Sequence, residues 1–395
     1  MIIKENIYSV GVLNPQLRVF DIIMETEFGT TYNAYLVKGE NKTALIETVH
    51  IHYFDEYLEK ISAICDIADI DYIVLNHTEP DHSGSLARLI ELNPNITVVS
   101  SMAGNKYVSA ICNCKFNGQI VKDGDSIDLG GKTLRFTIAP FLHWPDSMFT
   151  YIAEDKVLFP CDFLGAHYCE SLMVDNKLHH KDKYEKALQY YYECIFGPFK
   201  ENVLNGLDKI KDLDFDVVCP SHGPILVEGI DSAIEKYRAW SSTVFHKNEV
   251  KKVVIAYVSA YGCTATMAEQ MKKGIESVGK FDVELINILE AENVIINEKI
   301  EHSDAVLFGS PTINRDALKP VWDIIAGIDA ITNKGKLCGV FGSYGWSGEA
   351  VKVLEERLRG LKMNVFGEGV RANFVPSNEE LEKVTAYAVE FAKSV

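Results

Sequence analysis

The sequence predicts a two-domain α+β and α/β protein, in which a sandwich of two β-sheets flanked by helices precedes a doubly wound, five-stranded parallel sheet. Three observations support this prediction. The chain has 395 residues, enough for two domains or more. Hydrophobic residues make up 47% and charged residues 24%, so a sizeable core can form. The pattern of the chain changes near residue 248, which predicts domains at residues 1–247 and 248–395.

Short apolar runs alternate with helical patterns in the first domain. The expected strands are Thr43–Glu47, Tyr72–Asn76, Thr97–Ser100, Thr133–Ala139, Met148–Ala153, Lys156–Pro160 and Val217–Pro220. The expected helices are Phe54–Cys65, Ser85–Leu92, Lys183–Phe196, Asn202–Ile210 and Gly229–Ser241. This mixture is typical of a layered αββα arrangement. The polar segment Ser242–Lys252 predicts a linker to the second domain.

The loop that follows the apolar run Tyr72–Leu75 carries the strongest chemical signal in the chain. His77, Glu79, Asp81 and His82 place two imidazoles and two carboxylates within six residues. Charges this close repel one another unless a cation neutralises them. The loop therefore predicts a metal site, and a solvated polar turn is the ordinary alternative.

The order His-x-Glu-x-Asp-His resembles the His-x-His-x-Asp-His signature of the metallo-β-lactamase fold. Glu79 stands where zinc hydrolases of that fold place a second His, and this hard anionic oxygen moves the preference from zinc toward iron or manganese. The resemblance implies further ligands at later strand ends, where His143, Asp162 and His222 follow apolar runs. The implied set is His77, Glu79 and His143 on one metal, Asp81, His82 and His222 on the other, and Asp162 as a bridge.

This nitrogen and oxygen donor set, which needs no cysteine, suits a non-haem di-iron centre. Its three carboxylates leave two divalent ions close to neutral, as a partly buried site requires. Taken alone, His143 beside Trp144 is typical of a packed histidine and Asp162 of a helix cap, so the inference rests on the whole set. Whether His82 binds the metal directly stays open, because the His of an adjacent Asp-His pair can instead lie behind the ligands and support them.

The second domain begins with an apolar strand, Lys252–Val258, a hydroxyl-rich loop and the helical pattern Met267–Val278. A strand, such a loop and a helix N-terminus together form a cradle for an anion such as phosphate. The later expected strands are Val283–Asn287, Ala305–Gly309, Leu337–Gly342 and Asn364–Glu368. Helical patterns lie between them, which is typical of a flavodoxin-like sheet.

Ligands of such sheets bind beyond the carboxyl ends of the strands, where three loops are expected to meet. FMN is favoured over a dinucleotide because no G-x-G-x-x-G follows the first strand. Tyr344 and Trp346 suit the face of an isoalloxazine, although either is also typical of plain packing. The first loop alone is equally typical of a helix cap, so the prediction rests on all three loops. The predicted FMN-binding residues are Ser259, Ala260, Tyr261, Gly262, Cys263, Thr264, Pro311, Thr312, Ile313, Asn314, Ser343, Tyr344, Gly345, Trp346 and Gly348.

Composition restricts the partners of the protein. A net charge of −17 argues against binding to nucleic acid or to an anionic membrane surface. No apolar stretch approaches the roughly 18 residues of a membrane span, and the first residues do not resemble a signal peptide. The nine scattered cysteines form no paired framework, so we expect free thiols in a reducing cytoplasm and no rubredoxin module. The electron donor is then a separate protein or cofactor.

Several segments together resemble those of flavodiiron proteins, also called A-type flavoproteins. They are the His77–His82 loop, Gly29–Leu36, Leu142–Phe149, Pro311–Asn314 and Phe341–Gly348. The resemblance covers essentially the whole chain and implies a metallo-β-lactamase-like di-iron domain followed by a flavodoxin-like FMN domain. It also implies two iron ions per chain, reduction of dioxygen to water and/or nitric oxide to nitrous oxide, and a donor such as rubredoxin or a reduced deazaflavin. A head-to-tail homodimer, or a dimer of such dimers, is expected.

Three residues are candidates for catalytic roles. Glu79 is expected to connect the flavin edge to its iron, Tyr191 to donate a hydrogen bond or a proton, and His167 to support the metals. For Tyr191 and His167, plain core packing is the ordinary alternative. A metallo-hydrolase of the glyoxalase or lactamase type with an accessory flavodoxin domain is the second functional hypothesis, although Glu79 counts against it. An electron shuttle with a vestigial metal site is the third.

Overall fold

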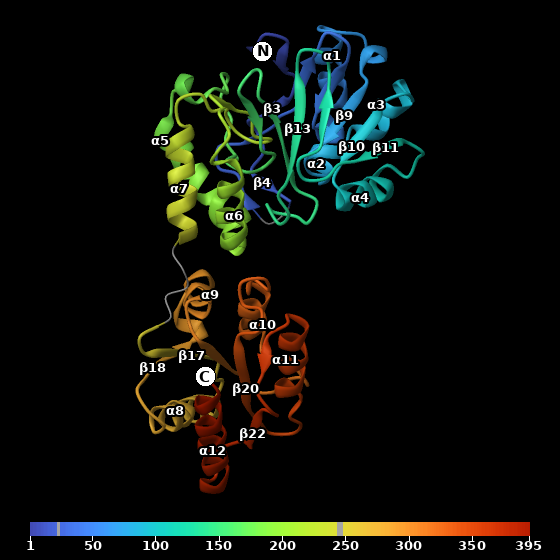
Figure 1. Ribbon diagram of the computed structural model, residues 1–395. Helices are drawn as coiled ribbons and strands as arrows, with labels where there is room; N and C mark the ends of the chain where they lie inside the picture. Colours follow the sequence, from blue (N-terminus) through green and yellow to red (C-terminus); the bar gives the residue numbers. More distant parts are fainter. Residues whose placement is uncertain (22–23, 243–247) are drawn as a thin grey trace. The chain divides into compact units, whose positions relative to one another are not determined.

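Two β-sheets packed face to face form the first part of the chain (Figure 1). The computed structural model describes residues 1–21, 24–242 and 248–395, and it divides into two units, Met1–Thr243 and Val244–Val395. Residues 243–247 of the predicted linker lie outside the described residues. The predicted domain boundary between residues 247 and 248 therefore stays a prediction.

The first sheet contains seven strands, β1 (Ile2–Lys4), β2 (Ile7–Ser9), β7 (Tyr35–Lys38), β8 (Thr43–Ile46), β9 (Tyr72–Leu75), β10 (Thr97–Ser100) and β11 (Asn117–Ile120). The second contains five, β12 (Ser126–Asp128), β13 (Thr133–Ile138), β14 (Met148–Ile152), β15 (Val157–Phe159) and β16 (Val217–Val218). Each strand predicted in this unit ends within two residues of an observed one. Two small sheets, which the sequence did not predict, pair β3 (Val12–Asn14) with β6 (Thr30–Tyr32) and β4 (Val19–Phe20) with β5 (Met24–Glu25).

Helices cover the outer face of each sheet (Figure 1). Those on the first sheet are α1 (Phe54–Ser62), α3 (Leu86–Leu92) and α4 (Met102–Cys112). Those on the second are α5 (Lys181–Tyr191), which continues as a π-helical turn, α6 (Lys200–Ile210) and α7 (Ile230–Ser242). Alternation along the strands explains the layers, because Ile73 of β9 packs toward α1 and α3 while Val74 packs between the sheets. The αββα sandwich predicted from the sequence is confirmed.

Asn76 follows β9 and joins the two sheets at the edge from which the His77–His82 loop leaves. Its carbonyl accepts from the Met148 amide at 2.9 Å, and its side chain bonds to the Thr150 hydroxyl at 2.7 Å and to the Phe159 carbonyl at 3.3 Å. Strands β13, β15 and β16 run in one direction, so their carboxyl ends share this edge. Loops that leave these strands and β9 are thereby brought together.

The second unit is a doubly wound parallel sheet, as predicted. Its strand order is β18 (Phe281–Asn287), β17 (Lys251–Tyr257), β19 (Ala305–Gly309), β20 (Leu337–Tyr344) and β21 (Asn364–Val365). The predicted fifth strand, Asn364–Glu368, is shorter than expected, and β22 (Val370–Asn373) pairs with the second half of β20. Gly367, with φ of 54°, lies in the turn that divides the two strands.

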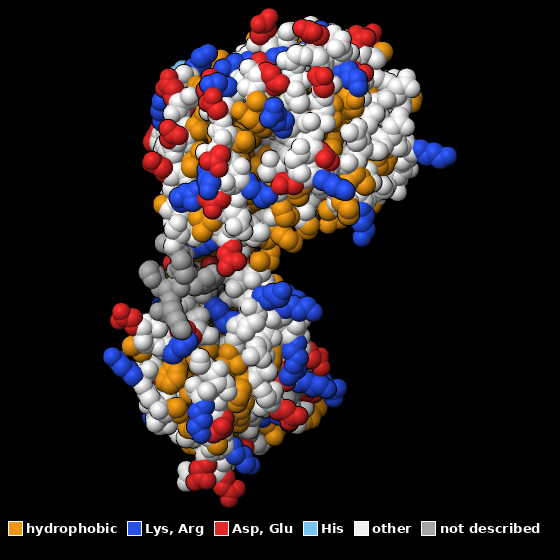
Figure 2. Space-filling model, in the orientation of Figure 1, with side chains coloured by type: hydrophobic (Ala, Val, Ile, Leu, Met, Phe, Trp, Pro, Cys, Tyr) orange, Lys and Arg blue, Asp and Glu red, His pale blue; other side chains and the backbone are white. Residues whose placement is uncertain are grey.

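Helices cover both faces of this second sheet. Met267 and Met271 of α8 (Cys263–Glu276) pack with Val384 of α12 (Asn378–Ser394) on one face. The other face is covered by α9 (Asn293–Glu301), α10 (Lys319–Ala326) and α11 (Glu349–Gly360). On the face drawn in Figure 2, acidic and basic side chains are intermixed. None of the helices in the described ranges is long and apolar enough to cross a membrane.

Candidate functional site

The seven side chains that the sequence assigned to a metal centre lie together at one edge of the first unit. Two triplets each have their ligand atoms within 4.8 Å of one another, namely His77, Glu79 and His143, and Asp81, His82 and His222. Asp162 lies between the triplets. Its Oδ1 is 3.4 Å from His222 Nε2, and its Oδ2 is 3.8 Å from His143 Nε2. The geometry can thus accommodate two ions, with Asp162 between them.

His77 is held by a carboxylate that the sequence reasoning did not assign. Its Nδ1 lies 3.2 Å from both oxygens of Asp146, which also accepts from the Thr78 amide at 2.8 Å and the Thr78 hydroxyl at 2.7 Å. The Nδ1–H donates to Asp146, so Nε2 is left to face Glu79 at 3.1 Å. This arrangement fixes the tautomer that a metal-binding imidazole needs.

His222 is oriented by the N-terminal segment of the unit. Its Nδ1 donates to the Thr31 carbonyl at 2.5 Å, and the Thr31 hydroxyl accepts from the Gly223 amide at 2.8 Å. The Asn33 side chain donates to the Gly223 carbonyl at 2.9 Å. His222 Nε2 is consequently turned toward Asp81 Oδ2, 3.0 Å away.

The cluster is buried and rich in negative charge. Among the described residues, neither carboxylate oxygen of Asp81 has a hydrogen-bond partner, although that side chain is only 6% exposed. Burial opposes the charge of Asp162, but the imidazoles of His82 and His222 hold its pKa well below the usual range. A buried carboxylate without hydrogen bonds is costly unless a cation lies beside it. The donor set therefore fits a pair of metal ions.

Tyr191 and His167 lie directly behind the cluster. The Tyr191 hydroxyl donates to Asp162 Oδ1 at 3.1 Å. The His167 ring packs against Tyr191 and His222, with centroid distances of 4.8 and 4.9 Å, and its Nδ1 is 2.8 Å from the Thr30 hydroxyl. His167 Nε2 is buried and has no hydrogen-bond partner in the described part of the chain. Tyr191 thus contacts a proposed ligand by a hydrogen bond and His167 contacts one by ring packing, while both are also buried. Their catalytic roles stay predictions.

The three predicted flavin loops meet at the carboxyl ends of β17, β19 and β20. The hydroxyls of Thr264 and Ser343 are 2.8 Å apart, and the Thr312 amide donates to the Ser343 carbonyl at 2.9 Å. The first contact joins the first loop to the third, and the second contact joins the second loop to the third. The other predicted residues of these loops lie in the same segments and are Ser259, Ala260, Tyr261, Gly262, Cys263, Pro311, Ile313, Asn314, Tyr344, Gly345, Trp346 and Gly348.

The first loop leaves the start of α8 open to an anion. Gly262 precedes the helix with φ of 85°, and the Ser259 hydroxyl of the same loop accepts from the first-turn amide of Ala265 at 3.2 Å. The N-terminus of a helix favours an anion such as phosphate. Tyr261 and Trp346 are 91% and 87% exposed, so both rings are available to stack on a flat ligand. The loops therefore fit a phosphorylated, flat cofactor such as FMN.

Comparison with known proteins agrees with both halves of the structure. The model of the ODP family beta lactamase matches residues 30–223, and the flavodoxin model matches residues 255–386. A flavo-diiron protein of Clostridium acetobutylicum is 50% identical over 398 residues, which cover 100% of this chain and 99% of that protein. The chain belongs to the flavodiiron protein family.

Solved flavodiiron structures have the same fold. Rubredoxin oxygen:oxidoreductase of Desulfovibrio gigas is 31% identical with a TM-score of 0.68, covering 100% of this chain and 98% of that chain. The flavodiiron protein of Giardia intestinalis is 29% identical with a TM-score of 0.65, covering 99% and 95%. The nitric oxide reductase of Moorella thermoacetica is 35% identical over 386 residues, or 96% of this chain and 95% of that protein.

Membership of the flavodiiron family makes this chain an oxidoreductase with a di-iron domain and a flavodoxin domain that binds FMN. The hydrolase hypothesis drawn from the sequence has no support among these relatives.

Sequence reasoning missed two acidic residues that lie beside the cluster. Glu47, at the end of β8, is 1% exposed, accepts from the Asn76 amide at 2.9 Å and lies 3.8 Å from His82 Nδ1. Burial raises the pKa of Glu47 to about 8. Asp21 is exposed, but partial desolvation and the nearby carboxylates of Glu79 and Asp81 raise its pKa to about 6. An acidic residue directly after an apolar strand was a usable signal for Glu47, whereas nothing in the sequence distinguishes Asp21.

Proposed function

We propose that this flavodiiron protein reduces dioxygen to water, nitric oxide to nitrous oxide, or both, with FMN passing electrons from an external donor to a non-haem di-iron centre. The observation that carries the proposal is the convergence of seven potential ligands in a chain that also contains a flavodoxin domain. Among the relatives, one is named a rubredoxin oxygen:oxidoreductase and another a nitric oxide reductase, so both activities occur at comparable identity.

The proposal assigns two iron ions and one FMN to each chain. His77, Glu79 and His143 would hold one iron, Asp81, His82 and His222 would hold the other, and Asp162 would be the shared ligand. Four imidazoles and three carboxylates form a donor set that suits iron. Fully reduced FMN and the iron pair together supply four electrons, as dioxygen reduction to water requires.

The residues of the protein orient the ligands and supply polar hydrogens. Asp146 and the Thr31 carbonyl aim the Nε2 atoms of His77 and His222 into the cluster. The Tyr191 phenol holds Asp162 through its hydrogen bond and is placed to donate a proton nearby. In a head-to-tail homodimer, or a dimer of such dimers, Glu79 would connect its iron to the flavin edge.

The donor is proposed to be a separate molecule, either rubredoxin, which the name of the Desulfovibrio gigas relative includes, or a reduced deazaflavin. A cytoplasmic location is part of the proposal. It rests on the acidic composition and on nine cysteines that are free thiols in the described structure.

Single-turnover assays test this function. The purified protein is expected to be yellow, to contain about two iron atoms and one FMN per chain, and, once reduced without oxygen, to consume dioxygen or nitric oxide. Stopped-flow mixing of the reduced protein with each gas in turn measures which one reoxidises it faster. Zinc in the site together with thioester hydrolysis would overturn the proposal.

A further inference from the structure

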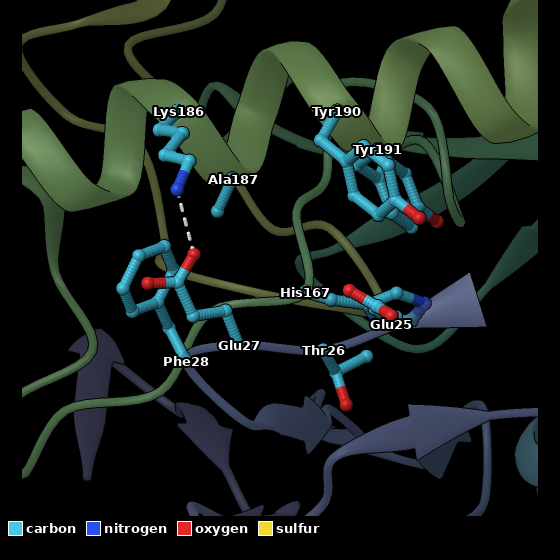
Figure 3. A pocket seen from close by; sticks show the side chains of 9 residues that line it. All are labelled: Glu25, Thr26, Glu27, Phe28, His167, Lys186, Ala187, Tyr190 and Tyr191. Atoms are coloured by element: carbon cyan, nitrogen blue, oxygen red, sulfur yellow. Dashed lines mark hydrogen bonds and ion pairs between the residues drawn. The ribbon is translucent and has the colours of Figure 1, made fainter. Parts of the chain in front are cut away.

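A cavity of about 180 Å³ lies between residues 25–28 and helix α5 (Figure 3). Lys186 and Glu27 are its solvent-side residues, since their side chains are 68% and 61% exposed and their charged atoms are 2.7 Å apart. Tyr191 and His167, like Thr26, are almost fully buried residues of its lining. The cavity therefore extends from the surface of the first unit to two interior aromatic side chains.

The inner wall of this cavity is shared with the metal cluster. Tyr191 lines the cavity, and its hydroxyl donates to Asp162 at 3.1 Å. His167 also lines it, and its ring packs on that of His222 at 4.9 Å. One layer of side chains, from Tyr191 and His167, separates the cavity from two proposed iron ligands.

The size and the lining of the cavity restrict what it can hold. The Phe28 and Tyr190 rings and the Ala187 methyl group contribute nonpolar walls. Polar or charged groups of the lining come from Glu25, Thr26, Glu27, His167 and Lys186. An apolar cavity of roughly 150 Å³ holds a xenon atom or a benzene molecule, whereas sites for larger ligands start at roughly 300 Å³. A small uncharged molecule such as a diatomic gas fits, and a nucleotide or a thioester does not.

We propose that this cavity is the docking and entry site for the diatomic substrate, and that His167 and Tyr191 form the gate between it and the iron pair. The inference rests on the proposed gas reduction and adds the route by which the gas arrives. Ala187 controls the available volume because its methyl group is part of the wall at the middle of the lining helix.

Xenon binding tests the cavity independently of turnover. Crystals of the protein with its iron and FMN, pressurised with xenon, are expected to show a xenon atom between Phe28 and Ala187. The Ala187→Phe variant fills this volume and should lose the xenon. Gln189→Phe adds the same side chain to the exposed face of the same helix, outside the cavity, and should keep it. An unfilled cavity in pressurised wild-type crystals would overturn the proposal.

Stopped-flow kinetics test the route. Ala187→Phe is expected to lower the second-order rate constant for reoxidation by the gas roughly tenfold, within the one to three decades over which association rates of related variants vary. Reduction by the donor, iron content and FMN content should stay unchanged. Ala187→Leu adds less volume and should give a smaller decrease, which keeps the test available where phenylalanine is not accommodated. Equal constants for wild type, Ala187→Leu and Ala187→Phe would refute the route.

The two proposals fail in different ways. If xenon occupies the cavity but neither the wild-type protein nor its variants consume either gas, the proposed gas reduction is wrong. The wild-type protein could consume gas while its pressurised crystals bind no xenon and Ala187→Phe leaves the reoxidation rate constant unchanged. In that case only the route is wrong.

Discussion

Asp146 lies behind His77 and does not face the cluster. Its carboxylate accepts from the imidazole and from Thr78, and the Ser101 hydroxyl donates to its carbonyl at 2.9 Å. A carboxylate placed in this way orients a metal-binding imidazole and raises its basicity. Iron binding therefore depends on a residue that contributes no ligand of its own.

We predict that Asp146→Asn weakens iron binding roughly 10- to 100-fold, as removal of such supporting carboxylates does elsewhere. The amide cannot accept from His77 and Thr78 with the same strength, so the ring loses its orientation. Competition with an iron chelator measures the affinity. Asp155→Asn serves as the control. Asp155 lies on the turn between β14 and β15, and its carboxylate is paired with Lys132. Equal affinities of the two variants would contradict this role.

The candidate metal ligands were predictable from the sequence because each is a His, Asp or Glu placed just after an apolar strand. The structure brings all seven together, although their ligand roles stay a prediction. Thr31 could not be found in this way, because it orients His222 through a backbone carbonyl that any residue possesses. Asp146 was visible in the sequence, but no pattern connected it to His77.

The last helix, α12, begins with a capping box. The Ser377 hydroxyl accepts from the Glu380 amide, and the Glu380 carboxylate accepts from the Ser377 amide at 2.9 Å and from Asn373 at 2.8 Å. We predict that Ser377→Ala lowers the free energy of unfolding of this unit by about 1 kcal/mol. Urea denaturation followed by circular dichroism measures the change. Ser394→Ala, at the far end of the helix, should cost less.

Lys336 connects β20 to the last turn of α9. Its ammonium donates to the carbonyls of Ile300 and Glu301 at 2.5 and 2.8 Å, and burial lowers its pKa to about 8. Between this value and the unfolded value of about 10.4, the unfolded chain holds a proton that the folded protein has released. The contribution of Lys336 to stability therefore rises with pH in that window, by at most about 1.4 kcal/mol per pH unit.

We expect this pH dependence to disappear in Lys336→Met. The quantity to compare is the difference in unfolding free energy between wild type and variant at pH 7.5, 8.5 and 9.5, because titrations common to both proteins cancel. Lys334→Met, at an exposed neighbouring position, should follow the wild type. A constant difference across this range would show that Lys336 does not titrate there.

Among the elements, those with a long alternating or helical pattern were predicted best. Strand β10 has the predicted ends, because Val98 and Val99 face opposite packed layers. Strands β4 and β5 have two residues each, too few for any period to be recognised. The helix predicted over Lys183–Phe196 changes to a π-helical turn at Tyr192, a change that apolar spacing does not reveal.

At the scale of the whole molecule, each unit has its own hydrophobic clusters and its own set of candidate cofactor residues. We therefore predict that the two cofactors can be lost separately. His143→Ala should lower the iron content while FMN stays bound, and Gly262→Val should release FMN while iron stays. A β-branched residue is strained at the φ of 85° that Gly262 adopts.

Metal analysis and flavin absorbance measure both contents. Gly279→Val is the matched control, because that glycine has no positive φ and an added Cβ meets no atom within 4 Å. Loss of flavin from His143→Ala would mean that the cofactors are not assigned to separate units.

The two-domain fold itself was predictable, because the change of pattern near residue 248 reflects the change from the two-sheet sandwich of the first unit to the parallel sheet of the second. The division of the fifth strand at Gly367 was not, because it depends on a local turn.

The hydrogen bond between Thr31 and His222 ties the beginning of the first unit to its end. On a ribosome, a nascent chain that has emerged only as far as Asp162 has six of the seven candidate ligands but neither His222 nor the loop that Thr31 and Asn33 hold. Stable metal insertion must then wait until almost the entire first unit has been synthesised.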